Sequence, residues 1–423
     1  FPGCICKLNS PNEIIKHILM MNGWLVKIKL NMHSFYSIFF LLVVFICSCS
    51  DAVDVNRDIK VIPVDFENYE SVSMSDLFTK IEVIELEGNS ESYLNSPSSL
   101  EINNGKIYLK DQHAVYSFDS NGKYLHNTKM RRGRASNEYF SVNDYYVDNE
   151  NIYIMDHDGS VYVYDSVLNM KERYNVPVSN VIFYKSIANL NNDIFALSGP
   201  AGSDTIVWNF YSKSEEKIVG TYFLTGIREG GYSFSLSREY ITNDEMTVYR
   251  LPDNGYSYYV LNPNSYTVTE LFQYNLGKYA FNPSKVDDKK SIASYIDEHK
   301  DKQIIAMETQ INNKFILCKL GLVESNSDSL PDLISNLKTR LSFYSLESGK
   351  HRLINNLFEN NKSILGFDYM DDSCLYLFNN YFELNQFLYE ESLLDDKSKK
   401  ILDGVNDETN GLIFKYYFKD NIL

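Results

Sequence analysis

The chain has 423 residues, of which 44% are hydrophobic and 23% charged, so it is long enough for one large or two medium globular domains. Its 33 Tyr and 25 Phe against only 10 Pro favour β-structure, because aromatic side chains suit the half-buried surface of a sheet. The formal net charge of −16 argues against nucleic acid as a partner, since an acidic surface repels the phosphate backbone.

Residues 1–48 are expected to form a targeting segment outside the fold. Lys27 and Lys29 precede the apolar run SFYSIFFLLVVFICS, which is shorter than the roughly 20 residues that a transmembrane helix needs. The run ends in Ile-Cys-Ser-Cys, which resembles a bacterial lipobox and implies a lipid on Cys49. An ordinary signal peptide and a membrane anchor are the alternatives. The chain begins with Phe, and Met21 is the favoured true start because it keeps both lysines.

Residues 49–74 are expected to hold a polar tether and a first strand. Alternating apolar residues in KVIPVDF (60–66) and IEVIEL (81–86) predict two strands, and SMSDLF between them predicts a helical turn.

A hairpin pattern then recurs along the chain. Residues 104–125 and 149–174 both contain a polar turn, an alternating apolar run, a second turn and an apolar-aromatic run that ends in Asp. One hairpin cannot bury both of its faces alone, so the repeat predicts an all-β, six-bladed β-propeller over residues 75–423, with seven blades as the alternative. The six units begin near Ile107, Ile152, Ile194, Met246, Phe315 and Leu375, and their partner strands are 115–119, 161–165, 206–211, 256–262, 341–347 and 387–391.

Two insertions and a tail complete the pattern. Residues 284–308 place isoleucines in a charged background, which predicts an amphipathic helix, and residues 328–340 predict a short helix or lid. Such insertions often lie on the binding face of a repeat array, although covering a strand edge is an equal alternative. The tail GLIFKYYF (411–418) predicts a last strand, and we expect this tail or IEVIEL to close the ring.

Residues 81–140 contain more than a generic hairpin: IEVIELEG, the first repeat, FDSNGKYL and MRRGRASNEYF. This series resembles the six-bladed β-propeller lipoproteins of Bacteroidetes, relatives of NHL-type propellers, whose first blade ends in an FD–GKFL strand followed by a GRGPGEY loop. Here the loop has Arg134 near that place and lacks the Pro. The resemblance is strongest over residues 81–175. It implies a propeller fold and a lipid-anchored location in the cell envelope, at the outer membrane, and it transfers no catalytic residues.

The candidate ligand-binding residues are Arg131, Arg132, Arg134, Glu138 and Tyr139. The three arginines form the basic cluster of an acidic chain. Guanidinium groups on a glycine-containing loop can hold a carboxylate or sulfate through paired hydrogen bonds. The alternative is that the arginines clamp the first two blades together through ion pairs with Glu138 and nearby acids.

Other motifs favour structural roles. The Asp-His-Asp-Gly run at 156–159 resembles part of a calcium loop but lacks the bidentate Glu, so a hairpin turn is expected. No HExxH, G-x-S-x-G or phosphate-binding glycine loop occurs, so neither a metal nor a cofactor is expected. Cys318 and Cys374 lie in apolar strand-like contexts and are expected to be buried free thiols, with a disulfide as the alternative.

A set of aromatic residues could line a groove that stacks on sugar rings, although such residues in strands are more often core or cross-strand pairs. The set consists of Tyr256, Tyr258, Tyr259, Phe382 and Tyr389.

The sequence therefore predicts an envelope-anchored lipoprotein whose propeller binds a glycan, a peptide or a partner protein without catalysis. The alternative is a metal-dependent hydrolase or lyase, because similar propellers include such enzymes; it needs acidic and His ligands converging on the central channel. A scaffold role, marked by a large apolar surface patch, is a third possibility.

Overall fold

The computed structural model describes residues 60–423 with gaps. The residues outside this description are 1–59, 96, 112, 134, 136–137, 149–150, 202–204, 226–239, 243–246, 251–255, 281–302, 324–337, 358–367, 380–388, 421 and 423. The chain divides into two compact units, Phe1–Asp58 and Ile59–Leu423. All described residues belong to the second unit, so the predicted leader and Cys49 lie outside them. Within the described part, no helix has the length and apolarity to cross a membrane.

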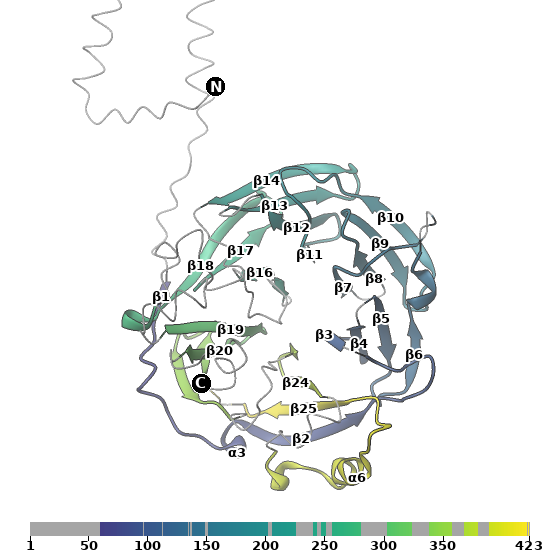
Figure 1. The fold of residues 1–423 in the computed structure, drawn as a ribbon. Coiled ribbons are helices and arrows are strands. Elements are labelled where there is room, and N and C mark those ends of the chain that lie inside the picture. Colours follow the sequence, from purple (N-terminus) through teal and green to yellow (C-terminus); the bar gives the residue numbers. More distant parts are fainter. Residues whose placement is uncertain are drawn as a thin grey trace, which may run out of the picture. The chain divides into compact units, whose positions relative to one another are not determined.

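The second unit is a six-bladed β-propeller, as predicted (Figure 1). Blades 1 to 3 each contain four consecutive antiparallel strands, and the first strand of each blade lies nearest to the axis. Blade 1 consists of β3 (Pro97–Asn103), β4 (Lys106–Asp111), β5 (Ala114–Phe118) and β6 (Tyr124–Asn127); blade 2 of β7 (Asp144–Asp148), β8 (Asn151–Met155), β9 (Ser160–Asp165) and β10 (Met170–Asn175); blade 3 of β11 (Ser186–Asn189), β12 (Ile194–Pro200), β13 (Thr205–Ser212) and β14 (Lys217–Thr225).

Blades 4 and 6 also recruit strands from the start of the chain. Blade 4 consists of β15 (Tyr240–Thr242), β16 (Thr247–Arg250), β17 (Ser257–Asn262), β18 (Thr267–Asn275) and β1 (Lys60–Pro63); blade 5 of β19 (Gln303–Ile311), β20 (Phe315–Val323), β21 (Lys338–Ser345) and β22 (His351–Asn355); blade 6 of β23 (Tyr369–Met370), β24 (Cys374–Asn379), β25 (Leu412–Phe418) and β2 (Phe78–Glu85). The helices among the described residues are α3 (Met74–Leu77), α6 (Asp396–Gly404) and the 3-10 turns η2 (Lys129–Arg131), η3 (Gly277–Tyr279) and η6 (Glu391–Leu393).

The predicted hairpins are the two middle strands of each blade. In blade 1, for example, Ile107 of β4 pairs with Phe118 of β5. The prediction is wrong for the last blade, in which residues 387–391 were expected to form the strand that pairs with β24. Tyr389 and Glu390 are not in a strand, and β24 pairs with β25 instead. The tail supplies a continuous strand, Leu412–Phe418, whose first three residues are all fully buried.

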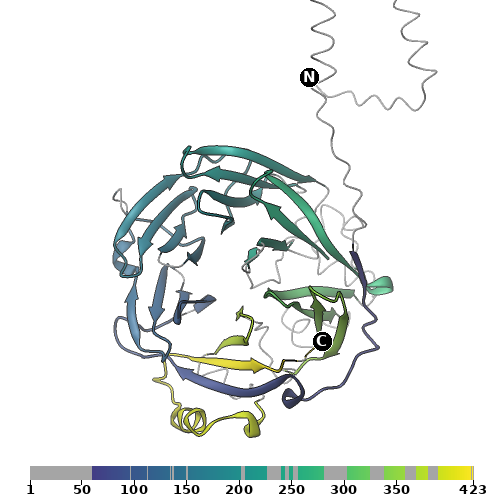
Figure 2. The ribbon, with the colours of Figure 1, turned by 180° about the vertical axis from the view of Figure 1, so that it is seen from behind.

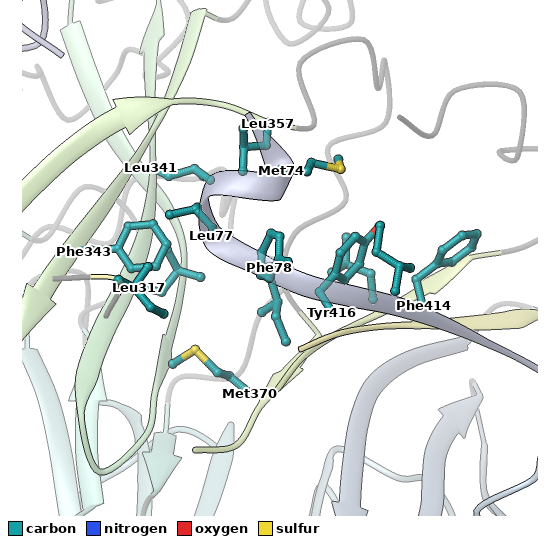
Figure 3. Packing of buried hydrophobic residues seen from close by; sticks show 14 of the residues in the cluster. Met74, Leu77, Phe78, Leu317, Leu341, Phe343, Leu357, Met370, Phe414 and Tyr416 are labelled. Carbon is teal, nitrogen blue, oxygen red and sulfur yellow. The ribbon is translucent and has the colours of Figure 1, made fainter. Parts of the chain in front are cut away.

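Both ends of the propeller unit's chain close the ring. The tail strand β25 lies between β24 and β2, so the two segments proposed as closing strands pair with each other. Figure 3 shows Phe78 of β2 and Tyr416 of β25 facing the side chains of blade 5. The Phe78 and Tyr416 ring centroids are 5.2 Å apart. This pairing removes the open sheet edge that an unclosed blade would have.

Residues 60–77 run along the rim from blade 4 to blade 6. Strand β1 pairs in parallel with β18, and the purple segment can be followed along the outer edge in both views (Figures 1 and 2). Further on, the amide of Glu70 donates to the carbonyl of Leu353, and the Glu70 carboxylate pairs with Arg352 at 2.8 Å. Residue 60 therefore already belongs to the propeller unit, which was expected to begin at residue 75.

The described core residues form six hydrophobic clusters, one between each pair of neighbouring blades. Each blade is buried on both faces, which explains why successive residues such as Tyr108 and Leu109 are both buried. Cys318 lies between blades 4 and 5 and Cys374 between blades 6 and 1, so the prediction of two buried free thiols is confirmed.

The aromatic set proposed for sugar stacking belongs mostly to this core. Tyr258 is fully buried, and Tyr256 is 9% exposed in the same cluster. Tyr259 and Tyr389 pack against two other clusters, and Phe382 lies outside the described residues. The core role that the sequence favoured for these aromatic residues is therefore confirmed for the described members, whose rings fill the space between blades.

The predicted insertion helix at 284–308 is only partly visible. Residues 303–308 lie in β19, where Ile305 pairs with Gly321 of β20, so this part is strand and not helix. Residues 284–302 lie outside the described residues, as do 328–337 of the second predicted insertion. Residues 338–340 of that segment begin β21.

Candidate functional site

The two ends of the ring differ in their connections. One end carries the turns between the first and second and between the third and fourth strands of a blade, and these turns are short, as at 104–105, 119–123, 312–314 and 346–350. The other end, here called the loop end, carries the connections between blades and between second and third strands. In the described part of the chain, its connections include 156–159, 176–185 and, apart from residues 134, 136 and 137, 128–143. Long connections gathered at one end are typical of the binding face of a repeat array.

The candidate arginine cluster lies at the loop end, in the connection from blade 1 to blade 2. Two backbone hydrogen bonds close a loop after the 3-10 turn η2. The amide of Gly133 donates to the carbonyl of Tyr139, and the amide of Tyr139 donates to the carbonyl of Arg131, each at 3.0 Å. Inside this loop the Glu138 carboxylate accepts from the amide of Ala135 at 2.9 Å. Arg134 lies outside the described residues.

Tyr139 is a structural residue, which corrects its assignment as a ligand contact. Its side chain is fully buried, and its hydroxyl bonds Thr128 and donates towards the carbonyl of His113 at 3.0 Å. Burial raises the pKa of this phenol above its usual value. Tyr139 therefore anchors the loop to the interior of the protein and offers no surface to a ligand.

Arg131 and Arg132 contact main-chain carbonyls. Nη2 of Arg131 donates to the carbonyl of Leu168 in blade 2 at 3.2 Å, which links the first two blades. Nε of Arg132 donates to the carbonyl of Phe140 at 3.2 Å, and its guanidinium lies 6.0 Å from the centroid of the Phe140 ring. Arg131 thus has the geometry of the clamp alternative, whereas Arg132 is exposed and available to a ligand.

The Asp-His-Asp-Gly run forms the hairpin turn between β8 and β9. Asp156 is buried, and its carboxylate accepts from the amides of Phe140 and Ser141 and from the Ser141 hydroxyl. Burial opposes ionisation of Asp156, but these hydrogen bonds and the His157 ring outweigh it and hold the pKa of the carboxyl below its usual value. Asp156 therefore ties the blade 1–2 connection to the turn of blade 2, a role that its spacing did not reveal.

The connection from blade 2 to blade 3 packs on the other side of the same turn. The amide of Val176 donates to the carbonyl of Gly159, and a Cβ at Gly159 would come within 3.1 Å of the Tyr184 ring. The Tyr184 hydroxyl donates to the carbonyl of Pro177 at 2.8 Å, and the amide of Ile182 donates to the carbonyl of Pro200 at 2.7 Å. These bonds fix residues 176–185 in place without regular secondary structure.

Both fixed connections expose apolar side chains. Met130 and Phe140 are 88% and 50% exposed in the first connection, and Val178, Ile182 and Phe183 are 48%, 66% and 44% exposed in the second. His157 belongs to the turn that both connections pack against, and its exposed ring contacts Phe140, with ring centroids 5.6 Å apart. We call Met130, Arg132, Phe140, His157, Val178, Ile182 and Phe183 the blade 2 surface.

Apart from the blade 2 surface, a polar hollow of about 550 Å³ lies where the ring closes. Its lining comes from the end of β2, the β5–β6 turn and the segment before β25, and includes Glu85, Glu87, Lys123, Glu408 and Asn410. Within the described ranges, no three or more His, Cys, Asp or Glu side chains are grouped so that they could hold a metal ion.

Comparison with known proteins gives a fold and a family. A "putative exported protein" from Bacteroides fragilis superposes with a TM-score of 0.62 at 12% identity, over 85% of this chain and 100% of that one. A member of the DUF4221 family from Bacteroides vulgatus aligns at 13% identity over 80% of this chain and 98% of that one, with a TM-score of 0.44. No curated protein matches the sequence. The sequence profile described as "Domain of unknown function (DUF4934)" matches residues 59–417, nearly the whole propeller unit. The chain therefore belongs to the DUF4934 family.

Proposed function

We propose that this protein is a cell-envelope lipoprotein, anchored through a lipid on Cys49, whose propeller binds a macromolecular ligand at the loop end without catalysing a reaction. The leader pattern and the likeness to NHL-type lipoprotein propellers support the anchor. The similar Bacteroides fragilis protein is described as a putative exported protein, which supports a place outside the cytoplasm for this chain.

The blade 2 surface is the observation that carries the binding proposal. Soluble proteins rarely leave several large apolar side chains together on their surface unless the patch contacts another molecule. Here the two connections that expose these side chains are held by hydrogen bonds to buried or blade residues such as Asp156 and Pro200. A surface fixed before binding loses little conformational entropy when a ligand arrives.

A thermal-shift screen of the purified full-length lipoprotein tests the type of function. A rise in the unfolding midpoint with oligosaccharides or peptides supports a binding propeller. A rise with divalent metal ions that a chelator reverses supports the alternative of a metal-dependent hydrolase or lyase and contradicts the proposal. The catalytic alternative rests on similar propellers rather than on any described residue.

The anchor has a separate test. Mass spectrometry of the mature protein should show an N-terminal peptide that begins at Cys49 and carries a diacylglyceryl group. A mature protein that retains residues upstream of Cys49 would contradict the anchor and leave the binding proposal untouched.

A further inference from the structure

We infer that the blade 2 surface docks a protein segment that presents apolar side chains beside carboxylates. This inference rests on the proposed binding function and specifies its ligand. The apolar contacts would come from Phe140, Ile182 and Phe183, and a carboxylate would bind the Nη groups of Arg132.

Hydrogen-bond donors are left over beside the apolar side chains. Arg132 uses only Nε on the protein, and within the part of the chain that the structure describes its Nη1 and Nη2 have no acceptor. The ring of His157 donates from Nδ1 to the Asp156 carboxylate at 2.7 Å, which orients it beside Phe140. Because Phe140 contacts the Arg132 guanidinium, the free Nη donors of Arg132 lie beside one exposed aromatic ring, which also contacts the His157 ring.

The charge of the molecule selects for an acidic partner at this surface. The whole chain carries −16, so most of its surface repels carboxylates. The first connection breaks this pattern with Lys129, Arg131 and Arg132 in close succession. A guanidinium holds a carboxylate through two parallel hydrogen bonds, which gives direction as well as attraction. The apolar side chains supply the binding affinity, and Arg132 selects a partner that carries a carboxylate.

A second copy of this chain fits the surface less well. A symmetric dimer places each surface against itself, so the basic connection of one copy would meet the basic connection of the other. A glycan fits less well too, because branched Val178 and Ile182 offer no flat face to a sugar ring. A protein segment with Asp or Glu beside Leu, Ile or Phe satisfies both the apolar and the basic residues.

A random short-peptide library displayed on phage, selected against the full-length protein, tests this. We expect the recovered peptides to combine apolar residues with Asp or Glu. A recovered peptide, made with a fluorescent label, should bind about tenfold more weakly to Arg132→Gln and at least as much more weakly to the Ile182→Ser/Phe183→Ser variant, by fluorescence anisotropy.

The matched controls are exposed residues elsewhere on the molecule. Phe223→Ser changes a phenylalanine that is 51% exposed on β14, and Lys217→Gln removes an exposed cation beside Glu215. Both should leave the peptide affinity unchanged, and all variants should keep the wild-type unfolding midpoint. Recovery of no peptide, of peptides without acidic residues, or of peptides that bind the Ile182/Phe183 variant normally would overturn the inference. Binding of oligosaccharides in the thermal-shift screen would then still uphold a binding propeller.

Discussion

Buried polar groups at single residues make this fold sensitive to pH. His351 is hydrogen-bonded to the hydroxyl of Ser342 at 2.9 Å, and Ser342 also bonds the Tyr274 hydroxyl at 2.9 Å. Burial lowers the pKa of His351 to about 4. An unfolded chain, with a His pKa of about 6.5, takes up the proton more readily, so stability is complete above pH 6.5 and falls as the pH drops towards 4.

We predict that the free energy of unfolding falls by about 2 kcal/mol from this residue between pH 7 and pH 5. Urea unfolding at the two pH values measures the change. His351→Gln should lose this part of the pH dependence. An equal pH dependence in the variant and the wild type would show that the neutral ring of His351 is not responsible.

Tyr139→Phe separates the structural role of this residue from a ligand role. The variant leaves the carbonyl of His113 and the side chain of Thr128 without their shared hydroxyl partner in the interior. We expect a loss of about 1–3 kcal/mol in the free energy of unfolding. Tyr93→Phe, at a residue that is 54% exposed, is the control and should change little. A stable Tyr139→Phe variant with weakened peptide binding would return Tyr139 to the ligand site.

At the scale of elements, the middle strands of the blades and the two closing strands were predictable, and the inner strands were less so. The middle strands are aromatic, as in VYVYD, and they are bounded by turn residues. Inner strands such as β11 (SIAN) and β23 (YM) are too short to show a pattern, and the longer inner strand β19 resembled a helix because its isoleucines lie in a charged background. Residues 303–308 show why spacing alone failed for the insertion helix: pairing with β20 decides their conformation.

The closing strand β25 should matter more than its place at the end of the sequence suggests. Phe414 is fully buried in the cluster between blades 5 and 6 and pairs with Val83 of β2 (Figure 3). Phe414→Ala is expected to cost about 3–5 kcal/mol of unfolding free energy, because it leaves a cavity where three strands meet. The exposed Phe223→Ala should cost less than about 1 kcal/mol by the same denaturation measurement. Similar losses in both variants would mean that β25 does not close the ring.

The candidate site shows the same limit of sequence reasoning. The arginine cluster was predictable from local charge, and the structure places Arg132 on an exposed connection. The burial of Tyr139 was not predictable, because nothing in the sequence distinguishes this residue among 33 tyrosines. The exposure of Val178, Ile182 and Phe183 was missed because an apolar run such as VIFY resembles a buried strand. Only the path of the connection around the turn of blade 2 decides that these side chains point outwards.

At the scale of the whole molecule, a closed ring should unfold as one unit. Cys318 and Cys374 report on two different blade interfaces, and both thiols are buried. Burial, with the nearby Asp371 carboxylate, raises the pKa of Cys374 to about 12, so the native thiol is unreactive. We predict that a thiol reagent in moderate urea labels Cys318 and Cys374 at the same rate. Mass spectrometry of the protein at successive times measures the two labelling rates. Faster labelling of Cys374 alone would show that the seam between blades 6 and 1 opens before the rest.

Binding at the loop end is the central claim, and site-specific photo-crosslinking in intact cells tests it most directly. A photoreactive amino acid is placed at Phe183, and at Phe223 as the control, and the tagged protein is recovered after irradiation. The account predicts a discrete higher-mass adduct at Phe183 that disappears when Arg132→Gln is added, and no adduct at Phe223. No adduct at Phe183, or the same adducts at both positions, would contradict it.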